Sequence, residues 1–264
     1  MANKYFDDEA TLLKNIMAVP KNEILLLPNN KNTRLIKRLL KEKKFDKWCI
    51  EAENTNFPPD VYIDEYKLMG DFMMVNDSEH YVRDKKGKLK NINRQKEADS
   101  MAYKKLTHQI DVNKLDGVTL IIDSDTSNVP PEELHNFKWY LECFKRVVGN
   151  HIRKIPTYQK NHSGYQTIFF VIDESPGYCE PHYKANTGKN YFGHRHLPCF
   201  DFEFMKIFQN ADVDYVVLHM PWKCFQTPFG LNILYRLVIV DLKYLEQIRF
   251  VKYDHTNMVN CGWI

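Results

Sequence analysis

A chain of 264 residues with 44% hydrophobic side chains is long enough to bury a core of its own. Its 37 basic and 34 acidic side chains leave a net charge of +3, which by itself implies no polyanionic partner. No apolar run reaches the roughly 20 residues of a membrane span, and the first residues lack the pattern of a secretory signal. We therefore expect a soluble, cytoplasmic protein that does not bind membranes. Residues 1–264 are expected to form a single α/β domain, and the sequence does not predict its oligomeric state.

Short apolar runs alternate with helical patterns along the chain. Strands are predicted at residues 23–27, 66–75, 118–122, 167–172, 213–218 and 234–240. Helices are predicted at residues 7–17, 32–48, 131–149, 201–209 and 241–247. This alternation indicates a mixed or mainly parallel central sheet flanked by helices. The stretch 175–199 has no apolar period and is expected to be an irregular loop.

Two tracts are rich in basic residues. The first, at 34–47, follows the outer face of a predicted helix, and the second, at 83–105, includes the segment DKKGK, which suggests a hairpin tip or a loop that turns at Gly87. Each tract is either an ordinary solvated surface or a set of phosphate contacts, and we predict nucleic acid as the partner. The candidate phosphate-binding residues are Arg34, Lys37, Arg38, Lys41, Lys85, Lys86 and Lys88.

The stretch FPPDVYIDEYKLMGDFMMVND, residues 57–77, contains two acids that could converge. Asp60 follows two prolines and precedes one apolar run, and Asp71 lies inside the next run, eleven residues later. If the two runs pair as strands, both carboxylates lie beside one sheet, which is how a divalent metal is held for phosphodiester chemistry. The alternative is that Asp60 caps a turn and Asp71 is an ordinary polar strand position.

This stretch resembles the PD-(D/E)XK nuclease superfamily, which has the restriction-endonuclease-like fold. The resemblance implies that Asp60 and Asp71 bind Mg²⁺ or Mn²⁺, joined by a glutamate of the preceding helix, Glu51 or Glu53. It also implies a lysine two residues after the second acid, where this chain has Met73, which can neither donate a proton nor stabilise an anion. Either Lys67 takes the place of that lysine as a third catalytic residue, or the protein binds nucleic acid without cleaving it.

A second group of residues has spacing suited to zinc. Cys179 and His182 are separated by eleven residues from a second close group that begins at His194 and ends at Cys199. A structural zinc ion could anchor the expected loop through these four side chains. The alternative is a loop without metal and a buried Cys199.

A third pattern is the predicted strand that ends at Asp123 and Asp125. It resembles the start of haloacid-dehalogenase-type phosphotransferases, and also the DXD element of glycosyltransferases. Asp173 and Asp241 end predicted strands as well, so these acids could share a crevice or could simply begin turns. The preferred interpretation is a nucleic-acid-binding protein with a nuclease-like fold and a metal-dependent phosphodiesterase site. The alternatives are an inactive binding protein of that fold and a phosphohydrolase that uses Asp123 and Asp125.

Overall fold

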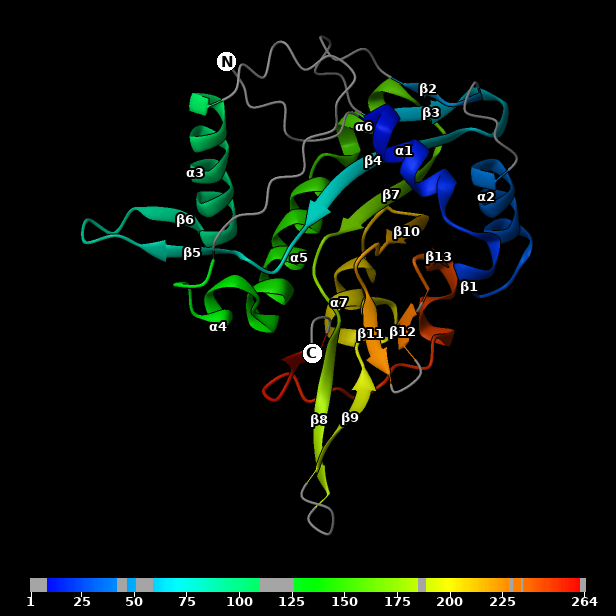
Figure 1. Ribbon diagram of the computed structural model, residues 1–264. Coiled ribbons are helices and arrows are strands. Elements are labelled where there is room, and N and C mark those ends of the chain that lie inside the picture. Colours follow the sequence, from blue (N-terminus) through cyan, green and yellow to red (C-terminus); the bar gives the residue numbers. More distant parts are fainter. Residues whose placement is uncertain are drawn as a thin grey trace.

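The computed structural model describes residues 9–41, 47–50, 59–109, 126–184, 189–227, 230–233 and 235–261 of the chain. Seven strands form one sheet in the order β1-β13-β10-β7-β4-β3-β2 (Figure 1). Along the chain these strands are β1 (Ile24–Leu27), β2 (Cys49–Ile50), β3 (Val61–Ile63), β4 (Leu68–Val75), β7 (Gln166–Asp173), β10 (Tyr215–His219) and β13 (Leu237–Asp241).

The sheet is mixed. Its centre, β4, β7 and β10, is parallel, whereas β2, β3 and β4 form an antiparallel meander at one edge. At the other edge β13 runs antiparallel to β10 and parallel to β1. The α/β class and the mixed sheet between helices, both predicted from the sequence, are confirmed.

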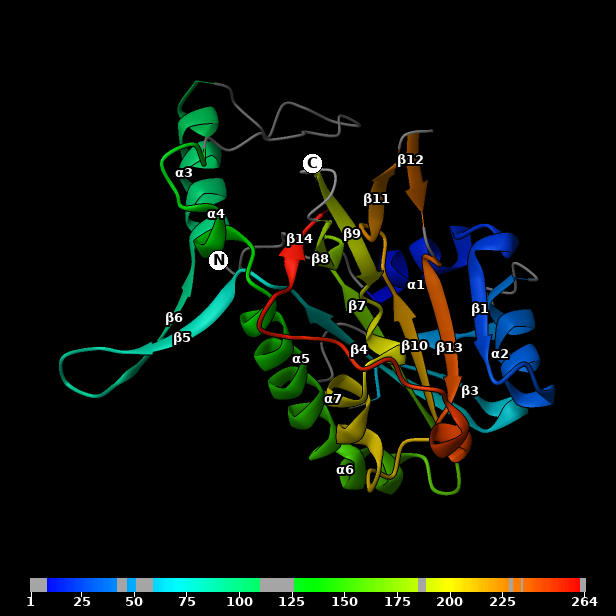
Figure 2. The same ribbon diagram turned by 90° about the horizontal axis from the view of Figure 1, so that it is seen from below.

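Helices cover both faces of the sheet, which is why its central strands are almost continuously apolar. One face packs against α1 (Glu9–Ala18) and α2 (Lys31–Lys41). The other packs against α5 (Phe137–Ile152), α6 (Ile155–Asn161) and α7 (Phe202–Met205). Figure 2 shows these two groups of helices on opposite sides of the strands. Side chains that alternate along β4 therefore enter two different cores.

The ends of several elements follow local rules. Asn30 precedes α2 and accepts hydrogen bonds from the backbone N–H groups of Asn32 and Thr33, both at 2.9 Å. The helix predicted to start at Asn32 thus begins at Lys31, with Asn30 as its N-cap. Asn136 caps α5 in the same way. Short 3-10 helices are η1 (Lys21–Glu23), η3 (Asp64–Tyr66), η5 (Pro198–Phe200), η6 (Lys206–Phe208) and η7 (Leu242–Gln247).

Two hairpins project from the sheet region (Figure 1). The first joins β5 (Glu79–Arg83) to β6 (Leu89–Asn93) through a turn at Gly87, whose φ of 74° suits glycine, and confirms the predicted hairpin tip. It is followed by α3 (Arg94–Gln109) and α4 (Pro131–Leu134). The second hairpin is β8 (Tyr178–Lys184) with β9 (Lys189–Arg195), and β14 (Val259–Asn260) pairs with β8. A further two-stranded ribbon consists of β11 (Cys224–Thr227) and β12 (Gly230–Ile233).

Two sequence expectations about the fold were wrong. The stretch 175–199, expected to be irregular, contains the β8–β9 hairpin, whose irregular register near Pro181 hides the alternation of a strand. Asp173 and Asp241 do not share a crevice, because β13 is antiparallel to its neighbour and Asp241 is paired with Tyr215 at the start of β10. In the described part of the chain, no helix has the length and apolar character needed to cross a membrane.

Candidate functional site

The register of the antiparallel meander brings Asp60 and Asp71 together. Val61, at the start of β3, is paired with Gly70 of β4, so the residues on either side, Asp60 and Asp71, face each other across the strands. Asp60 Oδ2 accepts a hydrogen bond of 2.6 Å from the backbone N–H of Phe72, and the two carboxyl groups are themselves hydrogen-bonded. Two acids that are eleven residues apart in the sequence thus form one pair.

Asp71 is held by two side chains from the covering helices. Asp71 is only 3% exposed, and its side chain points to the α5 side of the sheet. Tyr158 of α6 donates its hydroxyl to Asp71 Oδ2 at 2.5 Å, and His151 of α5 donates from Nδ1 to the same oxygen. Burial raises the pKa of Asp71, but the hydrogen bonds from His151 and Tyr158 outweigh it and hold that pKa below its ordinary value.

Asp60 shows the opposite shift. Burial and the neighbouring charge of Asp71 raise the pKa of Asp60 to about 8, so near neutral pH it carries the proton that the two carboxyls share. Glu9, in the first turn of α1, adds negative charge that favours this proton. A cation placed between the two carboxyls would relieve the same repulsion that the proton relieves.

Oxygen ligands of this kind fit Mg²⁺ or Mn²⁺. Magnesium commonly uses one or two carboxylates and keeps several water ligands. Within the described ranges, no group of three or more His, Cys, Asp or Glu side chains is placed to hold a metal ion. The pair Asp60 and Asp71 therefore supplies two protein ligands, and Glu51 and Glu53, predicted as the third, lie outside the described residues.

Met73, at the position where the nuclease motif has a lysine, is part of the apolar core. Met73 lies on the same side of β4 as Asp71 and is 3% exposed among the apolar residues that face α5. Lys67 is exposed in the turn before β4, with a φ of 48°. Among the described residues, no hydrogen bond or ion pair joins the side chain of Lys67 to Asp71.

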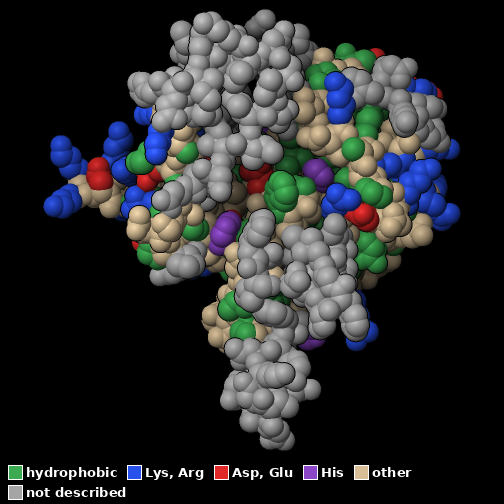
Figure 3. Space-filling view, in the orientation of Figure 1, with side chains coloured by type: hydrophobic (Ala, Val, Ile, Leu, Met, Phe, Trp, Pro, Cys, Tyr) green, Lys and Arg blue, Asp and Glu red, His purple; other side chains and the backbone are tan. Residues whose placement is uncertain are grey.

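The basic tract at 83–105 forms a projecting element. Lys85, Lys86 and Lys88 are exposed at the tip of the β5–β6 hairpin, where Asp84 accepts backbone hydrogen bonds that close the turn. Figure 3 shows basic side chains gathered on this hairpin at one end of the molecule and others over α2 at the opposite end. The two tracts that flank Asp60 and Asp71 in sequence are therefore far apart in space.

Part of the α2 tract serves the fold. Lys41 donates from Nζ to the main-chain carbonyls of Ile16, Met17 and Val19, which closes the end of α1. Lys37 donates in the same way to the carbonyl of Lys21 at 3.2 Å. Of the four candidates on this helix, Arg34 and Arg38 are the exposed ones.

The candidate zinc residues have several different environments. Cys199 is fully buried in the core beside α5, and burial raises the pKa of its thiol to about 12. Cys179 is buried against Cys261, and His194 Nδ1 hydrogen-bonds Glu180 at 3.1 Å. The side chain of His182 lies outside the description, as do Asp123 and Asp125.

A buried polar network, which the sequence did not indicate, lies beyond the carboxyl ends of β4 and β7. Lys223, 1% exposed, forms an ion pair with Asp173 at 3.3 Å and donates to Ser175 Oγ at 2.5 Å. Tyr140 donates its hydroxyl to Asp173 at 2.5 Å. Tyr178 and His135 hydrogen-bond Asp77 in the same region. Because Lys223, Asp173, Ser175 and Asp77 are buried and hydrogen-bonded or paired with one another or with neighbouring side chains, we interpret the network as structural.

The fold and the site define an α/β protein whose mixed sheet carries a pair of hydrogen-bonded carboxyls, one just before β3 and partly buried, the other within β4 and buried. In comparisons with protein-family models, with curated proteins and with solved structures, no match to this chain was found. Its function is therefore inferred from the residues themselves.

Proposed function

We propose that this protein binds nucleic acid and hydrolyses phosphodiester bonds with a divalent cation held by Asp60 and Asp71. The observation that carries the proposal is the contact between these two carboxyls, of which one needs a proton or a cation at neutral pH. The resemblance to PD-(D/E)XK nucleases requires two acids to converge on neighbouring strands. The meander of β3 and β4 provides such a pair, so we propose a restriction-endonuclease-like core.

The side chains around the pair have distinct roles in this proposal. When bound, Mg²⁺ or Mn²⁺ lowers the pKa of a water molecule and neutralises charge on the phosphate. Asp71 stays ionised because His151 and Tyr158 donate to it, so it is the permanent anionic ligand. Asp60 becomes a ligand by losing its proton, which makes cation binding release a proton at any pH below about 8.

The β5–β6 hairpin is the proposed contact with the phosphate backbone. Its exposed lysines project from the body of the protein, and binding to phosphates is dominated by such lysine and arginine side chains. The exposed Arg34 and Arg38 of α2 are a second, separate basic surface.

One observation favours a second candidate, a binding protein of the same fold that does not cleave. Met73 takes the position of the motif lysine and is packed in the core, so it contributes no proton or positive charge to the site. In this candidate the acid pair would hold a cation or a proton for stability only.

The test compares cleavage of single- and double-stranded DNA and RNA with Mg²⁺, with Mn²⁺ and with chelator. We expect cation-dependent cleavage by the wild type and its loss in Asp71→Asn, which preserves shape but removes the charge. The matched control is Asp64→Asn, an exposed acid between β3 and β4 that accepts from Tyr165 and should cleave normally.

Two results would decide against hydrolysis at this site. Cleavage that persists in Asp71→Asn would place the activity elsewhere. If neither protein cleaves but both bind nucleic acid in a salt-sensitive manner, the binding candidate replaces the nuclease.

A further inference from the structure

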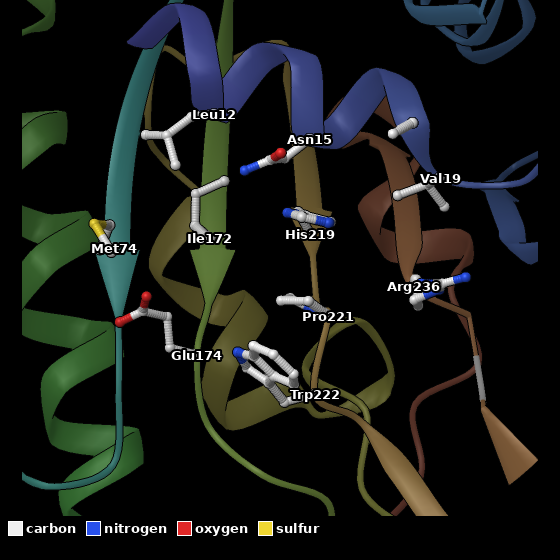
Figure 4. Close-up of a pocket in the computed structure, with 11 residues that line it drawn as sticks. Leu12, Asn15, Val19, Met74, Ile172, Glu174, His219, Pro221, Trp222 and Arg236 are labelled. Atoms are coloured by element: carbon white, nitrogen blue, oxygen red, sulfur yellow. The ribbon is translucent and has the colours of Figure 1, made fainter. Parts of the chain in front are cut away.

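A pocket of about 430 Å³ lies on the opposite face of the sheet from Asp71, under α1 (Figure 4). Its floor is one row of residues across the three parallel strands, since Met74 of β4 is paired with Ile172 of β7, and Ile172 with His219 of β10. All three lie at or next to the carboxyl ends of their strands. This edge of a parallel sheet is a common place for ligands, and the volume suits a small molecule.

The pocket contains a buried polar atom that lacks a partner. His219 is 7% exposed, and its Nδ1 has no hydrogen-bond partner within the described part of the protein. Burial and the charges of Arg236 and Lys41 lower the pKa of His219 to about 4, so the imidazole is neutral at physiological pH. Buried polar atoms of this kind are rare, and a water or a ligand usually completes them.

Two charged side chains, Arg236 and Glu174, are among the described residues that line the pocket. Arg236 donates to Glu23 from Nε and, at 3.0 Å, from Nη2. Glu174 carries an exposed carboxylate at the rim. A ligand that donates N–H groups would meet a strong acceptor in this carboxylate.

Trp222 gives the pocket a flat apolar side. Its side chain is 57% exposed, which is unusual for tryptophan. Figure 4 shows Trp222 beside Pro221 and Glu174, with Asn15 of α1 on the other side of His219. A planar ring that stacks on Trp222 would bring its edge towards the Glu174 carboxylate and the Asn15 amide. These two groups together offer both hydrogen-bond donors and acceptors.

We propose that this pocket binds a nucleobase with an exocyclic amino group. The base stacks on Trp222, its amino group donates to Glu174, and Asn15 and His219 supply the remaining polar contacts. Aromatic stacking combined with carboxylate and amide contacts to the base edge is how unpaired bases are recognised. Because the pocket and Asp71 lie on opposite faces of the sheet, this binding does not require the proposed hydrolysis.

Calorimetric titration with the 5′-monophosphates of adenosine, cytidine, guanosine and uridine tests the proposal. We expect one or more of the three amino-bearing nucleotides to bind more tightly than uridine monophosphate, which has no exocyclic amine. Trp222→Leu should weaken binding about 5- to 100-fold, the range that stacking on an aromatic ring contributes. Glu174→Gln should remove the preference for the amino-bearing base, because an amide can also donate.

Two controls separate this site from the acid pair and from general surface effects. Asp71→Asn should bind the nucleotides as the wild type does, even if it abolishes cleavage. Phe202→Leu, which changes another exposed aromatic residue, should also have no effect. A single-stranded oligonucleotide with one amino-bearing base among thymines distinguishes binding of a free nucleotide from binding of a base within a strand. Equal affinity for the monophosphate and the oligonucleotide indicates a free nucleotide, and tighter binding of the oligonucleotide indicates a base within a strand.

The proposal is overturned if none of the four nucleotides and no oligonucleotide binds. It is also overturned if binding occurs but is unchanged in both Trp222→Leu and Glu174→Gln. Circular dichroism of each variant, which should match the wild type because both side chains are exposed, ensures that a loss of binding is not a loss of fold.

Discussion

Asp60 and Asp71 have the same chemistry, yet their surroundings separate them into an acid and an anion. Asp71 receives hydrogen bonds from a histidine and a tyrosine, both of which favour its charged form. Asp60 receives one backbone N–H and faces the negative charge of Asp71, so its neutral form is favoured. The folded state therefore binds a proton at neutral pH that the unfolded chain does not hold.

This proton gives a prediction for Asp60→Asn. The folded pKa of Asp60 is about 8, above its ordinary value of 3.8, so its stabilising contribution is complete below 3.8 and is lost as the pH rises through 8. An asparagine mimics the protonated acid, because it donates to Asp71 and accepts from Phe72. We expect Asp60→Asn to stabilise the protein by about 1–3 kcal/mol at pH values above 8, with a smaller gain as the pH falls towards 4.

Thermal melting of the wild type and Asp60→Asn across this pH range measures the effect. Asp64→Asn is the control, since Asp64 is exposed and should change stability little at any pH. A melting difference between Asp60→Asn and the wild type that is the same at pH 4 and above pH 8 would show that no proton is bound by the pair.

At the scale of elements, the sequence predicted best those strands and helices that have one consistent local pattern. The strand predicted at 167–172 is observed as β7, Gln166–Asp173. The helix predicted at 131–149 is observed as two helices, α4 over Pro131–Leu134 and α5 over Phe137–Ile152. The β8–β9 hairpin was missed because its alternation is interrupted by Pro181 and because two histidines and a glycine occupy strand positions. The predicted helix at 241–247 is a 3-10 helix with a kink at Tyr244, a difference that apolar spacing does not reveal.

Gly70 shows how one strand position depends on a neighbouring element. It lies inside β4, where glycine is otherwise unfavourable. A Cβ atom there would come within 2.5 Å of Phe170 Cε2, so glycine leaves the space in which the ring lies across the sheet. We expect Gly70→Ala to destabilise the protein by about 1–3 kcal/mol through overpacking, measured by urea denaturation.

Gly149→Ala is the matched control for Gly70→Ala. Gly149 lies within α5, and its added Cβ would be 3.6 Å from Ile207 Cδ1, an ordinary contact distance. Alanine is the better helix former, so this change should stabilise the protein by about 0.5–1 kcal/mol. If both substitutions have the same sign, the packing of Phe170 against Gly70 is not as described.

We predict that the β5–β6 hairpin is the element that binds nucleic acid. Its tip lysines are exposed, so replacing them by glutamine should leave stability unchanged and weaken binding. The slope of log affinity against log salt should fall by about 0.9 for each lost contact with duplex phosphates. The substituted residues are Lys85, Lys86 and Lys88.

The control for the hairpin lies on α2. Replacing the exposed Lys31, Arg34 and Arg38 by glutamine removes the same charge from the opposite end of the molecule. Affinity and salt slope, measured by fluorescence anisotropy with labelled DNA and RNA, should change less in this variant than in the hairpin variant. A larger change in the α2 variant than in the hairpin variant would assign binding to α2. Unchanged affinity and salt slope in both variants would show that neither surface binds nucleic acid.

At the scale of the whole molecule, the candidate site combines local pairing with distant contacts. Asp60 and Asp71 could be predicted to meet because they lie on consecutive strands of a meander. His151 and Tyr158 could not, since they are 80 and 87 residues away from Asp71 and reach it only because α5 and α6 cover that face. Glu9, which acts on Asp60, is also distant in the sequence and lies on a helix of the other face. Contacts between residues so distant in the sequence cannot be predicted from the spacing of residues.

Lys223 joins three elements that are also distant in sequence. Its ammonium lies after β10, pairs with Asp173 at the end of β7, and is 4.4 Å from the centre of the Tyr140 ring of α5. It also donates to the carbonyl of Pro176 at 2.9 Å. Burial lowers the pKa of Lys223, but the acids around it oppose this effect and make the charge tolerable.

We expect Lys223→Met to destabilise the protein by about 3–5 kcal/mol, because it leaves the buried Asp173 carboxylate without a countercharge. Lys145→Met is the control, since the pair of Lys145 with Glu203 at 3.1 Å is partly exposed and should contribute less than about 1 kcal/mol. Adding Asp173→Asn to Lys223→Met removes the stranded charge and should recover part of the loss. Urea denaturation measures all three variants, and equal stability of the double and single mutants would mean that Lys223 acts by packing rather than by charge.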